Sequence, residues 1–216
     1  NRLTRFGHHA ECQEPPIFPS LLAELRVISD FFFTFMHGNE MRFSMGWFDD
    51  DYITHSPVVA IRTPDGLISA FANLLPGYQH QEMSVDLMRR RAEVENGTMD
   101  FLFVSMFEWA KARGCATFNL GLSALWGIGE QPTDPQVERL LRYIYQHVSE
   151  FYNFQGLHAF KEKFHPHWSP RYLVYPNPTA LPTVLWALGR ATAGDDLLWE
   201  QVVGWMQSGV GLARTR

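Results

Sequence analysis

The chain has 216 residues, 46% of them hydrophobic and 19% charged, and its formal net charge is −5. These totals are typical of an ordinary soluble globular protein with one compact domain and a short tail, because a chain of this length can bury a substantial core. The negative charge argues against broad, unspecific binding to nucleic acid, since neutralising phosphates requires a surplus of lysine and arginine.

Neither a disulfide framework nor a membrane span is expected. The two cysteines, Cys12 and Cys115, lie far apart in the sequence, which is typical of a reducing compartment. The most apolar run, residues 99–112, is interrupted by charged and polar side chains, whereas a span requires about eighteen uninterrupted apolar residues. Residues 1–17 are expected to be a linker or a trimmed junction.

The first half of the chain predicts a helix followed by three strands. Leucine, isoleucine and phenylalanine recur at helical spacing over residues 21–33. Two apolar runs, 58–62 and 67–74, flank an Asp-Gly pair, and such a pair tolerates the positive φ of a tight hairpin turn. A third strand is expected over residues 83–88.

The next segments predict a crossover between parallel strands. Residues 97–113 form a mostly apolar helical pattern with a narrow polar stripe, and Gly114 provides a C-terminal stop. A further strand is expected over residues 116–120. Strand, helix and strand in this order imply a right-handed crossover and a parallel pair.

The last third predicts mainly helices. Asp134-Pro135 is a suitable helix start, and the apolar residues that follow it fall on one face. We expect a late strand over residues 173–175 and weaker helices over 181–188 and 197–206. The whole order of elements gives an α/β or α+β sheet with helices on its faces.

Six segments together resemble one protein family. They read FSMGWFDDDYI (43–53), FANLLPGY (71–78), SVDLMRRR (84–91), NGTMDFLF (96–103), FNLGLSAL (118–125) and EFYNFQGLHAFKEKFHPHWSPRYLVYP (150–176). In this order they resemble the C-terminal catalytic domain of bacterial phosphatidylglycerol lysyltransferases, the MprF-type lysyl- and alanyl-phosphatidylglycerol synthases.

The resemblance implies a GNAT-like acyltransferase fold, a mixed central sheet with helices on both faces, over about residues 18–185. Residues 186–216 are then a C-terminal helical tail. Acetyl-CoA enzymes of this superfamily usually carry a Gly-rich pyrophosphate loop after the third strand, whereas residues 89–100 here contain a single glycine. Acetyl-CoA is therefore disfavoured as donor, and no cofactor is expected.

The resemblance also implies a reaction, the transfer of a lysyl or alanyl group from charged tRNA to the glycerol hydroxyl of phosphatidylglycerol. The partners implied are aminoacyl-tRNA and the lipid, at the cytoplasmic face of the bacterial inner membrane. The added positive charge would give resistance to cationic antimicrobial peptides. In the family, a membrane region or a second GNAT-like domain precedes this part of the protein. We expect this chain to be a soluble piece that lacks that preceding part.

Two other functions fit the sequence. One is a GNAT or Fem-type N-acyltransferase that acts on a soluble amine. The other is a non-catalytic binding half of a two-domain enzyme. Transfer from one ester to another requires a base, a group that stabilises the oxyanion, and accurate placement, so the residues that could supply these decide between the functions.

Asp86 is the predicted base or anchor for the substrate amine. A lone carboxylate inside an apolar strand costs free energy unless it is paired or functional, and a salt bridge with Arg89 or Arg90 is the alternative. Strict alternation would place Asp86 and Arg89 on opposite faces, so they can cooperate only if the strand bends or ends near Met88. The resemblance assigns Arg89 to a phosphate of the lipid or of the tRNA.

The aromatic segment 150–176 holds further candidates. Lys161 and Lys163 are predicted to stabilise a phosphate or the oxyanion; both could face one ligand on a strand but not on a helix, and Lys161 matches the family better. Glu150, Tyr152 and Asn153 are expected to recognise the aminoacyl ammonium or to orient the acceptor, or else to cap a helix or bond within the core. The surrounding aromatics suit an anionic ligand with an apolar body, or form ordinary core.

Asn119 and Ser123 follow the parallel strand, where open sheets commonly bind ligands, although a plain turn is the alternative for both. His165-Pro166-His167 has no Cys, Asp or Glu partners at a suitable spacing, so no metal site is predicted. The acidic run at residues 49–51 is interpreted as a solvated turn.

Overall fold

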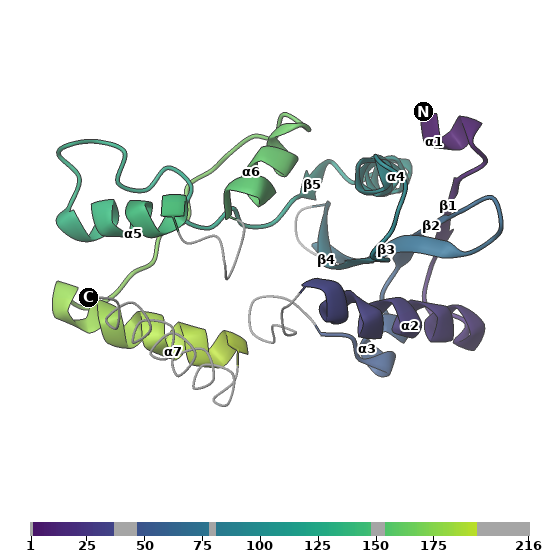
Figure 1. The fold of residues 1–216 in the computed structure, drawn as a ribbon, viewed down its shortest axis with the longest axis horizontal. Helices are drawn as coiled ribbons and strands as arrows, with labels where there is room; N and C mark the ends of the chain where they lie inside the picture. Colours follow the sequence, from purple (N-terminus) through teal and green to yellow (C-terminus); the bar gives the residue numbers. More distant parts are fainter. Residues whose placement is uncertain (1, 37–46, 78–80, 148–153, 194–216) are drawn as a thin grey trace, which may run out of the picture. The chain divides into compact units, whose positions relative to one another are not determined.

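The computed structural model describes residues 2–36, 47–77, 81–147 and 154–193 (Figure 1). The chain divides into two compact units. We call residues 1–118 together with 173–216 the sheet unit, and residues 119–172 the helical unit. Each unit is described by itself.

Five strands form one sheet in the order β1-β2-β3-β4-β5. Neighbouring strands pair antiparallel among the first four, which are β1 (His9–Gln13), β2 (Val58–Arg62), β3 (Ile68–Gly77) and β4 (Glu82–Arg90). Strand β5 (Thr117–Asn119) begins beside the start of β4, where Ala116 N donates to Gln81 O at 2.8 Å. Since both strands begin at the same end, β5 runs parallel to β4, and the sheet is mixed as predicted.

The predicted hairpin is confirmed. Strands β2 and β3 are joined by a tight turn in which Thr63 N donates to Leu67 O at 2.9 Å. Gly66 adopts a φ of +87°, a backbone conformation that costs glycine little and other residues much more. The Asp-Gly pair thus fixes the register of the two central strands.

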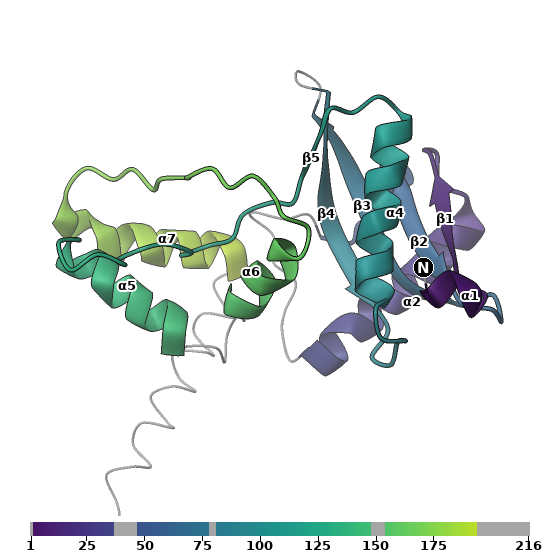
Figure 2. The same ribbon diagram turned by 90° about the horizontal axis from the view of Figure 1, so that it is seen from above.

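Helices cover both faces of the sheet, with α2 on one face and α4 on the other (Figure 2). The helices of this part are α1 (Arg2–Arg5), α2 (Pro19–Met36), α3 (Asp50–Thr54) and α4 (Thr98–Ala112). Helix α4 agrees with the predicted range, and a glycine in the left-handed region flanks each end, Gly97 at φ +93° and Gly114 at φ +78°.

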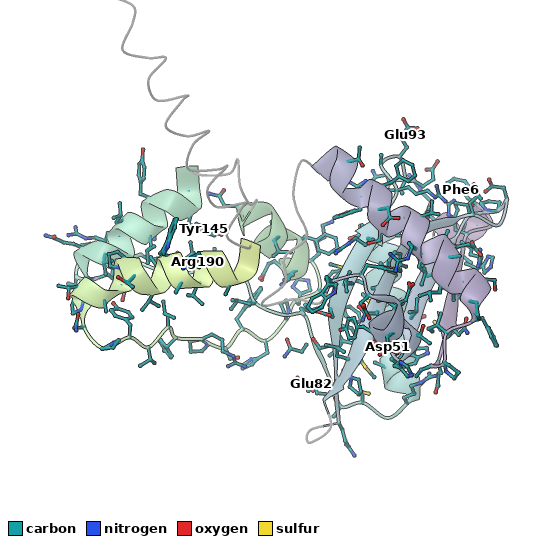
Figure 3. All side chains as sticks on the ribbon, turned by 90° about the horizontal axis from the view of Figure 1, so that it is seen from below. Phe6, Asp51, Glu82, Glu93, Tyr145 and Arg190 are labelled. Carbon is teal, nitrogen blue, oxygen red and sulfur yellow. The ribbon has the colours of Figure 1, made fainter. Side chains whose placement is uncertain are left out.

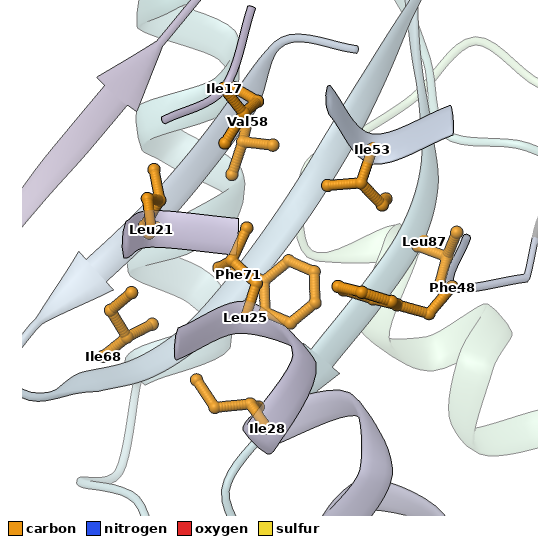
Figure 4. Close-up of a cluster of buried hydrophobic side chains, with 11 residues drawn as sticks. Ile17, Leu21, Leu25, Ile28, Phe48, Ile53, Val58, Ile68, Phe71 and Leu87 are labelled. Carbon is orange, nitrogen blue, oxygen red and sulfur yellow. The ribbon is translucent and has the colours of Figure 1, made fainter. Parts of the chain in front are cut away.

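The main hydrophobic core lies between the sheet and helices α2 and α3 (Figure 4). Phe71 of β3 lies at its centre and meets the edge of Phe48, with 6.1 Å between the ring centroids. Alternate residues of β2, Val58 and Ala60, point into this cluster, as the pleat of a strand requires. The core therefore holds α3 beside β4, the strand that carries Asp86.

Several elements differ from the predictions. Residues 1–17, expected as a linker, contain α1 and the edge strand β1. Residues 173–175 form no strand. The sheet unit also contains η1 (Pro178–Ala180) and α7 (Leu181–Ala193), which confirms the helix expected over 181–188, whereas the one expected over 197–206 lies outside the described residues.

The helical unit contains α5 (Gln136–His147) and α6 (Phe154–Glu162). Helix α5 begins just after Asp134-Pro135, as predicted. Helix α6 includes Lys161, so the strand geometry considered for Lys161 and Lys163 is wrong. Among all the helices described, none is both long and apolar enough to cross a membrane.

Candidate functional site

Strand β4 carries a β-bulge at Asp86, the carboxylate predicted to act as a base or as an anchor for the substrate amine. Its pairing with β3 shifts by one residue between Ala72 and Leu74, so Asn73 stands opposite two residues, Asp86 and Leu87. The side-chain oxygen of Asn73 fills the gap by accepting a hydrogen bond from Leu87 N at 2.8 Å. A bulge of this kind interrupts the strict alternation of side chains between the two faces.

The bulge places Asp86 and Arg89 on the same side of the sheet. Leu87 packs into the core beneath α2, and the guanidinium carbon of Arg89 lies 5.0 Å from the ring centroid of Phe32, which is on α2. Asp86 accepts a hydrogen bond from the hydroxyl of Tyr52, which packs against the same core from α3. Asp86 and Arg89 could cooperate only if the strand departed from strict alternation, and the bulge provides this departure.

Tyr52 orients the Asp86 carboxylate. Burial raises the pKa of the Tyr52 hydroxyl, and the hydrogen bond to Asp86 raises it further, while a hydrogen bond with Asn73 opposes the shift. Tyr52 consequently stays protonated and continues to donate at physiological pH. Tyr52 thus contacts the carboxylate directly, while the fully buried Asn73 holds the backbone of the bulge through Leu87 N.

Arg89 is a buried cation with 6% exposure. One of its terminal nitrogens donates to Met88 O at 2.9 Å, and its guanidinium faces the Phe32 ring. A buried charge is costly unless neighbouring groups compensate it, and the Met88 carbonyl and the Phe32 ring are two of the groups that do so here. Its predicted contact with a phosphate stays a prediction.

A cleft of about 530 Å³ opens beside Tyr52 in the sheet unit. Its walls include Asp49, Asp51 and His55. The expected solvated turn is in fact the start of α3, where the Asp49 carboxylate caps the helix by accepting from Tyr52 N at 3.0 Å, and Asp51, labelled in Figure 3, lies in the first turn. Tyr52 links this acidic cleft to Asp86.

The structure distinguishes the two candidate lysines of the helical unit. Lys161 is 5% exposed, and its ammonium donates to Leu122 O at 3.0 Å. Burial lowers the pKa of the Lys161 ammonium to about 8. Lys163 is exposed, and its ammonium lies 4.9 Å from the ring centroid of Phe160. Helix α6 ends at Glu162, so Lys161 is a buried helical residue and Lys163 a solvated residue just beyond the helix.

Ser123 contacts a histidine that sequence reasoning missed, since its Oγ lies 3.3 Å from Nδ1 of His158. His158 precedes Lys161 by three positions on α6, and this helical spacing was the signal that could have grouped them. Asn119 takes part in a turn, the alternative considered for it, because its side chain accepts a hydrogen bond from Gly121 N at 2.8 Å.

Other predicted residues are not brought together. Glu150, Tyr152 and Asn153 lie outside the described residues. Asp86 and Lys161 belong to different units, so their convergence on one pocket stays a prediction. In the part of the chain that the structure describes, no group of three or more histidine, cysteine, aspartate or glutamate side chains could hold a metal ion.

The sequence comparisons point to one family. The family model described as the C-terminal part of phosphatidylglycerol lysyltransferase matches residues 1–175. The phosphatidylglycerol lysyltransferase of Bacillus subtilis strain 168 is 40% identical over 190 residues, which are 88% of this chain and 22% of that protein. The one from Staphylococcus xylosus is 37% identical over 175 residues, 81% of this chain and 21% of its own length. The chain thus spans about a fifth of the curated relatives it matches.

Two solved structures share the fold. A crystal structure described as the C-terminal domain of a lysylphosphatidylglycerol synthetase from Agrobacterium fabrum has a TM-score of 0.75 and 38% sequence identity, covering 89% of this chain and 57% of that one. The structure of L-PGS from Bacillus licheniformis has a TM-score of 0.73 and 36% identity, covering 88% of this chain and 57% of that one.

Proposed function

Because the chain belongs to the phosphatidylglycerol lysyltransferase C-terminal family, we propose that it is a catalytic domain that moves an aminoacyl group from charged tRNA to the glycerol hydroxyl of phosphatidylglycerol. The family match over residues 1–175 is the observation that carries this proposal. The reaction takes place at the cytoplasmic face of the bacterial membrane. The positive charge added to the lipid gives resistance to cationic antimicrobial peptides.

Asp86 anchors the aminoacyl ammonium in this proposal. The hydrogen bond from Tyr52 occupies one carboxylate oxygen and fixes the direction of the group, as an anchor for a cation requires. The acidic walls of the cleft beside Tyr52 favour the same kind of ligand. Arg89 lies on the same side of the sheet and supplies positive charge for a phosphate.

Lys161 stabilises the oxyanion that forms when the acceptor oxygen attacks the ester. With a pKa of about 8, its ammonium is mostly protonated at neutral pH and has little competing water around it. Charge placed in such a poorly solvated position is worth more than the same charge in water. In this proposal Asp86 and Lys161 act on the same aminoacyl ester.

The test supplies the intact protein with charged tRNA labelled in its amino acid, either lysyl or alanyl, and with phosphatidylglycerol vesicles. Labelled lipid in the organic extract is the expected result, and Asp86→Asn and Lys161→Met should each reduce it at least about tenfold while the proteins stay folded. Label on a soluble amine would support an N-acyltransferase instead. Unchanged turnover in both folded variants would indicate a binding module.

A further inference from the structure

His158 is held between two indole rings in the helical unit. Its ring centroid lies 3.7 Å from that of Trp126, with the planes 16° apart, and 4.7 Å from that of Trp168, with the planes 30° apart. The side chain is 8% exposed overall. Because both faces of the imidazole are covered, only its edge, which carries the two nitrogens, is left for polar contacts.

Both nitrogens of His158 have a polar neighbour. Nδ1 lies 3.3 Å from Ser123 Oγ, and Nε2 lies 3.8 Å from a carboxylate oxygen of Glu162. The same carboxylate oxygen accepts a hydrogen bond from Trp168 Nε1 at 2.7 Å. Only the contact with Ser123 is within hydrogen-bond distance, whereas Glu162 is an electrostatic neighbour of Nε2. The negative carboxylate favours the tautomer with its proton on Nε2, in which Nδ1 accepts from Ser123.

The polar partners of the imidazole are side chains that can exchange protons. A buried imidazole needs polar neighbours whatever its role, and here they are the hydroxyl of Ser123 and the carboxylate of Glu162. Ser123 is partly exposed and follows Leu122, which is 63% exposed, whereas His158 is buried, so the serine lies nearer to solvent than the histidine. A reachable hydroxyl backed by an oriented base is the pattern of acyl-transfer sites.

The neighbouring charge fits the same chemistry. Lys161 follows His158 by one helical turn and donates to Leu122 O, the carbonyl just before Ser123. The ammonium also lies close to Gly121, since a Cβ at that position would be 3.8 Å from it, an ordinary van der Waals distance. The ammonium and the imidazole thus hold the same short segment from one face of α6, and Lys161 and Glu162 are the titratable side chains that accompany His158 on this face.

We propose that Ser123 is a catalytic residue that touches the acceptor hydroxyl, and that His158 is the positioning residue that takes up its proton. The inference rests on the proposed function for the identity of donor and acceptor. The acceptor hydroxyl gives its proton to Ser123 Oγ as Ser123 passes its own proton to Nδ1 of His158. The acceptor oxygen then bonds to the ester carbon.

The second half of the step reverses this path. The bond between the ester carbon and the ribose oxygen of the tRNA breaks, and the ribose oxygen takes a proton from Ser123, which recovers its own from His158. One ester bond forms and one breaks, no electrons are exchanged with another group, and the enzyme ends in its starting protonation state. Neither an oxidant nor a metal has to be supplied.

The variant that tests this is His158→Phe, because phenylalanine keeps an aromatic ring between Trp126 and Trp168 but removes both nitrogens. In the intact protein, kcat for aminoacyl transfer should fall by about 10²- to 10⁴-fold, with little change in KM for charged tRNA. The acidic limb of the pH–rate profile should disappear. His167→Phe replaces an exposed histidine of the same unit and should leave both unchanged.

A double variant separates a relay from two independent effects. Ser123→Ala alone should cost as much as His158→Phe, and the two together should cost no more than either, because each removes the same proton path. Losses that multiply, or an acidic limb that survives in folded His158→Phe, would overturn the proposal. If the wild-type protein transfers the aminoacyl group to another acceptor, only the lipid substrate is rejected, and the same variants are compared on that acceptor. If it transfers nothing, both the proposed function and the proposed roles of Ser123 and His158 are rejected.

Discussion

At the scale of single residues, the site depends on side chains whose charge is controlled by their surroundings. Tyr52 is kept protonated beside the Asp86 carboxylate by burial and by the hydrogen bond between them. Burial lowers the pKa of the Lys161 ammonium to about 8. At neutral pH the Tyr52 hydroxyl is therefore protonated and the Lys161 ammonium mostly so, and each loses its proton as the pH rises.

Lys161 gives the transfer rate an alkaline limb. Its pKa is about 8, and only the protonated form stabilises an oxyanion, so activity should fall as the pH rises above 8. Lys161→Arg should lower the rate but extend activity to higher pH, because a guanidinium stays charged. The measurement is a pH–rate profile of both proteins. An unchanged alkaline limb in the arginine variant would assign that limb to another group.

The same residue links stability to pH. The folded pKa of about 8 lies below the ordinary value of 10.5, so between these values the unfolded chain binds more protons and the free energy of unfolding should rise with pH. Below pH 8 the buried charge should lower stability. Lys161→Met should remove this rise, as measured by denaturant unfolding at pH 7 and pH 10. Lys163→Met, at an exposed position, should retain it.

At the scale of elements, the bulge in β4 decides which way Asp86 points. A regular strand would have sent Asp86 and Arg89 to opposite faces, whereas the extra residue opposite Asn73 brings both to the α2 side. The bulge is held by one side-chain hydrogen bond from Leu87 N to Asn73. The orientation of the candidate anchor thus depends on a residue in the neighbouring strand.

Asn73→Ala should test this dependence. It removes the buried acceptor of Leu87 N, so the free energy of unfolding should fall by about 1–3 kcal/mol, and transfer activity should fall further than stability explains, because Asp86 loses its direction. Thermal melts and the transfer assay measure the two effects. Asn96→Ala, at an exposed position just before α4, is the control and should change neither. Full activity in folded Asn73→Ala would mean that the bulge does not orient Asp86.

At the scale of the whole molecule, the two units differ in how they are stabilised. Every hydrophobic side chain that is buried in the described part of the chain belongs to the sheet unit. In the helical unit, the buried side chains described are polar, namely His158 and Lys161. Segments with few buried apolar contacts open at lower free energy than the core of a domain.

Hydrogen exchange should therefore differ between the units. Backbone amides of β2, β3 and α4 should exchange slowly, at rates set by global unfolding, whereas those of α5 and α6 should exchange faster through local opening. Mass spectrometry of peptides from each unit gives the comparison. Adding charged tRNA should slow exchange in α6 if this helix contacts the substrate. Equal protection of the two units without tRNA would contradict the expected difference.

Much of the fold could be predicted because its signals are local. The Asp-Gly turn at residues 65–66, the glycines that flank α4 and the helix start at Asp134-Pro135 each restrict their own backbone, whatever the rest of the chain does. The structure has no strand at residues 173–175 and has one within the first seventeen residues, contrary to the prediction, because pairing in a sheet depends on a partner strand that the local sequence does not specify. For β1 that partner is β2, some fifty residues further on.

The sequence by itself determined the family, the mixed sheet with helices on both faces, and the choice of Asp86, Arg89 and Lys161 as candidates. Only the tertiary structure decided their surroundings: the register shift that turns Asp86, the burial that lowers the pKa of Lys161, and the approach of His158 to Ser123 across 35 positions. The physical reason is that turns and helix ends are set by neighbours in the chain. Orientation, desolvation and proton paths are set by residues that only folding brings into contact.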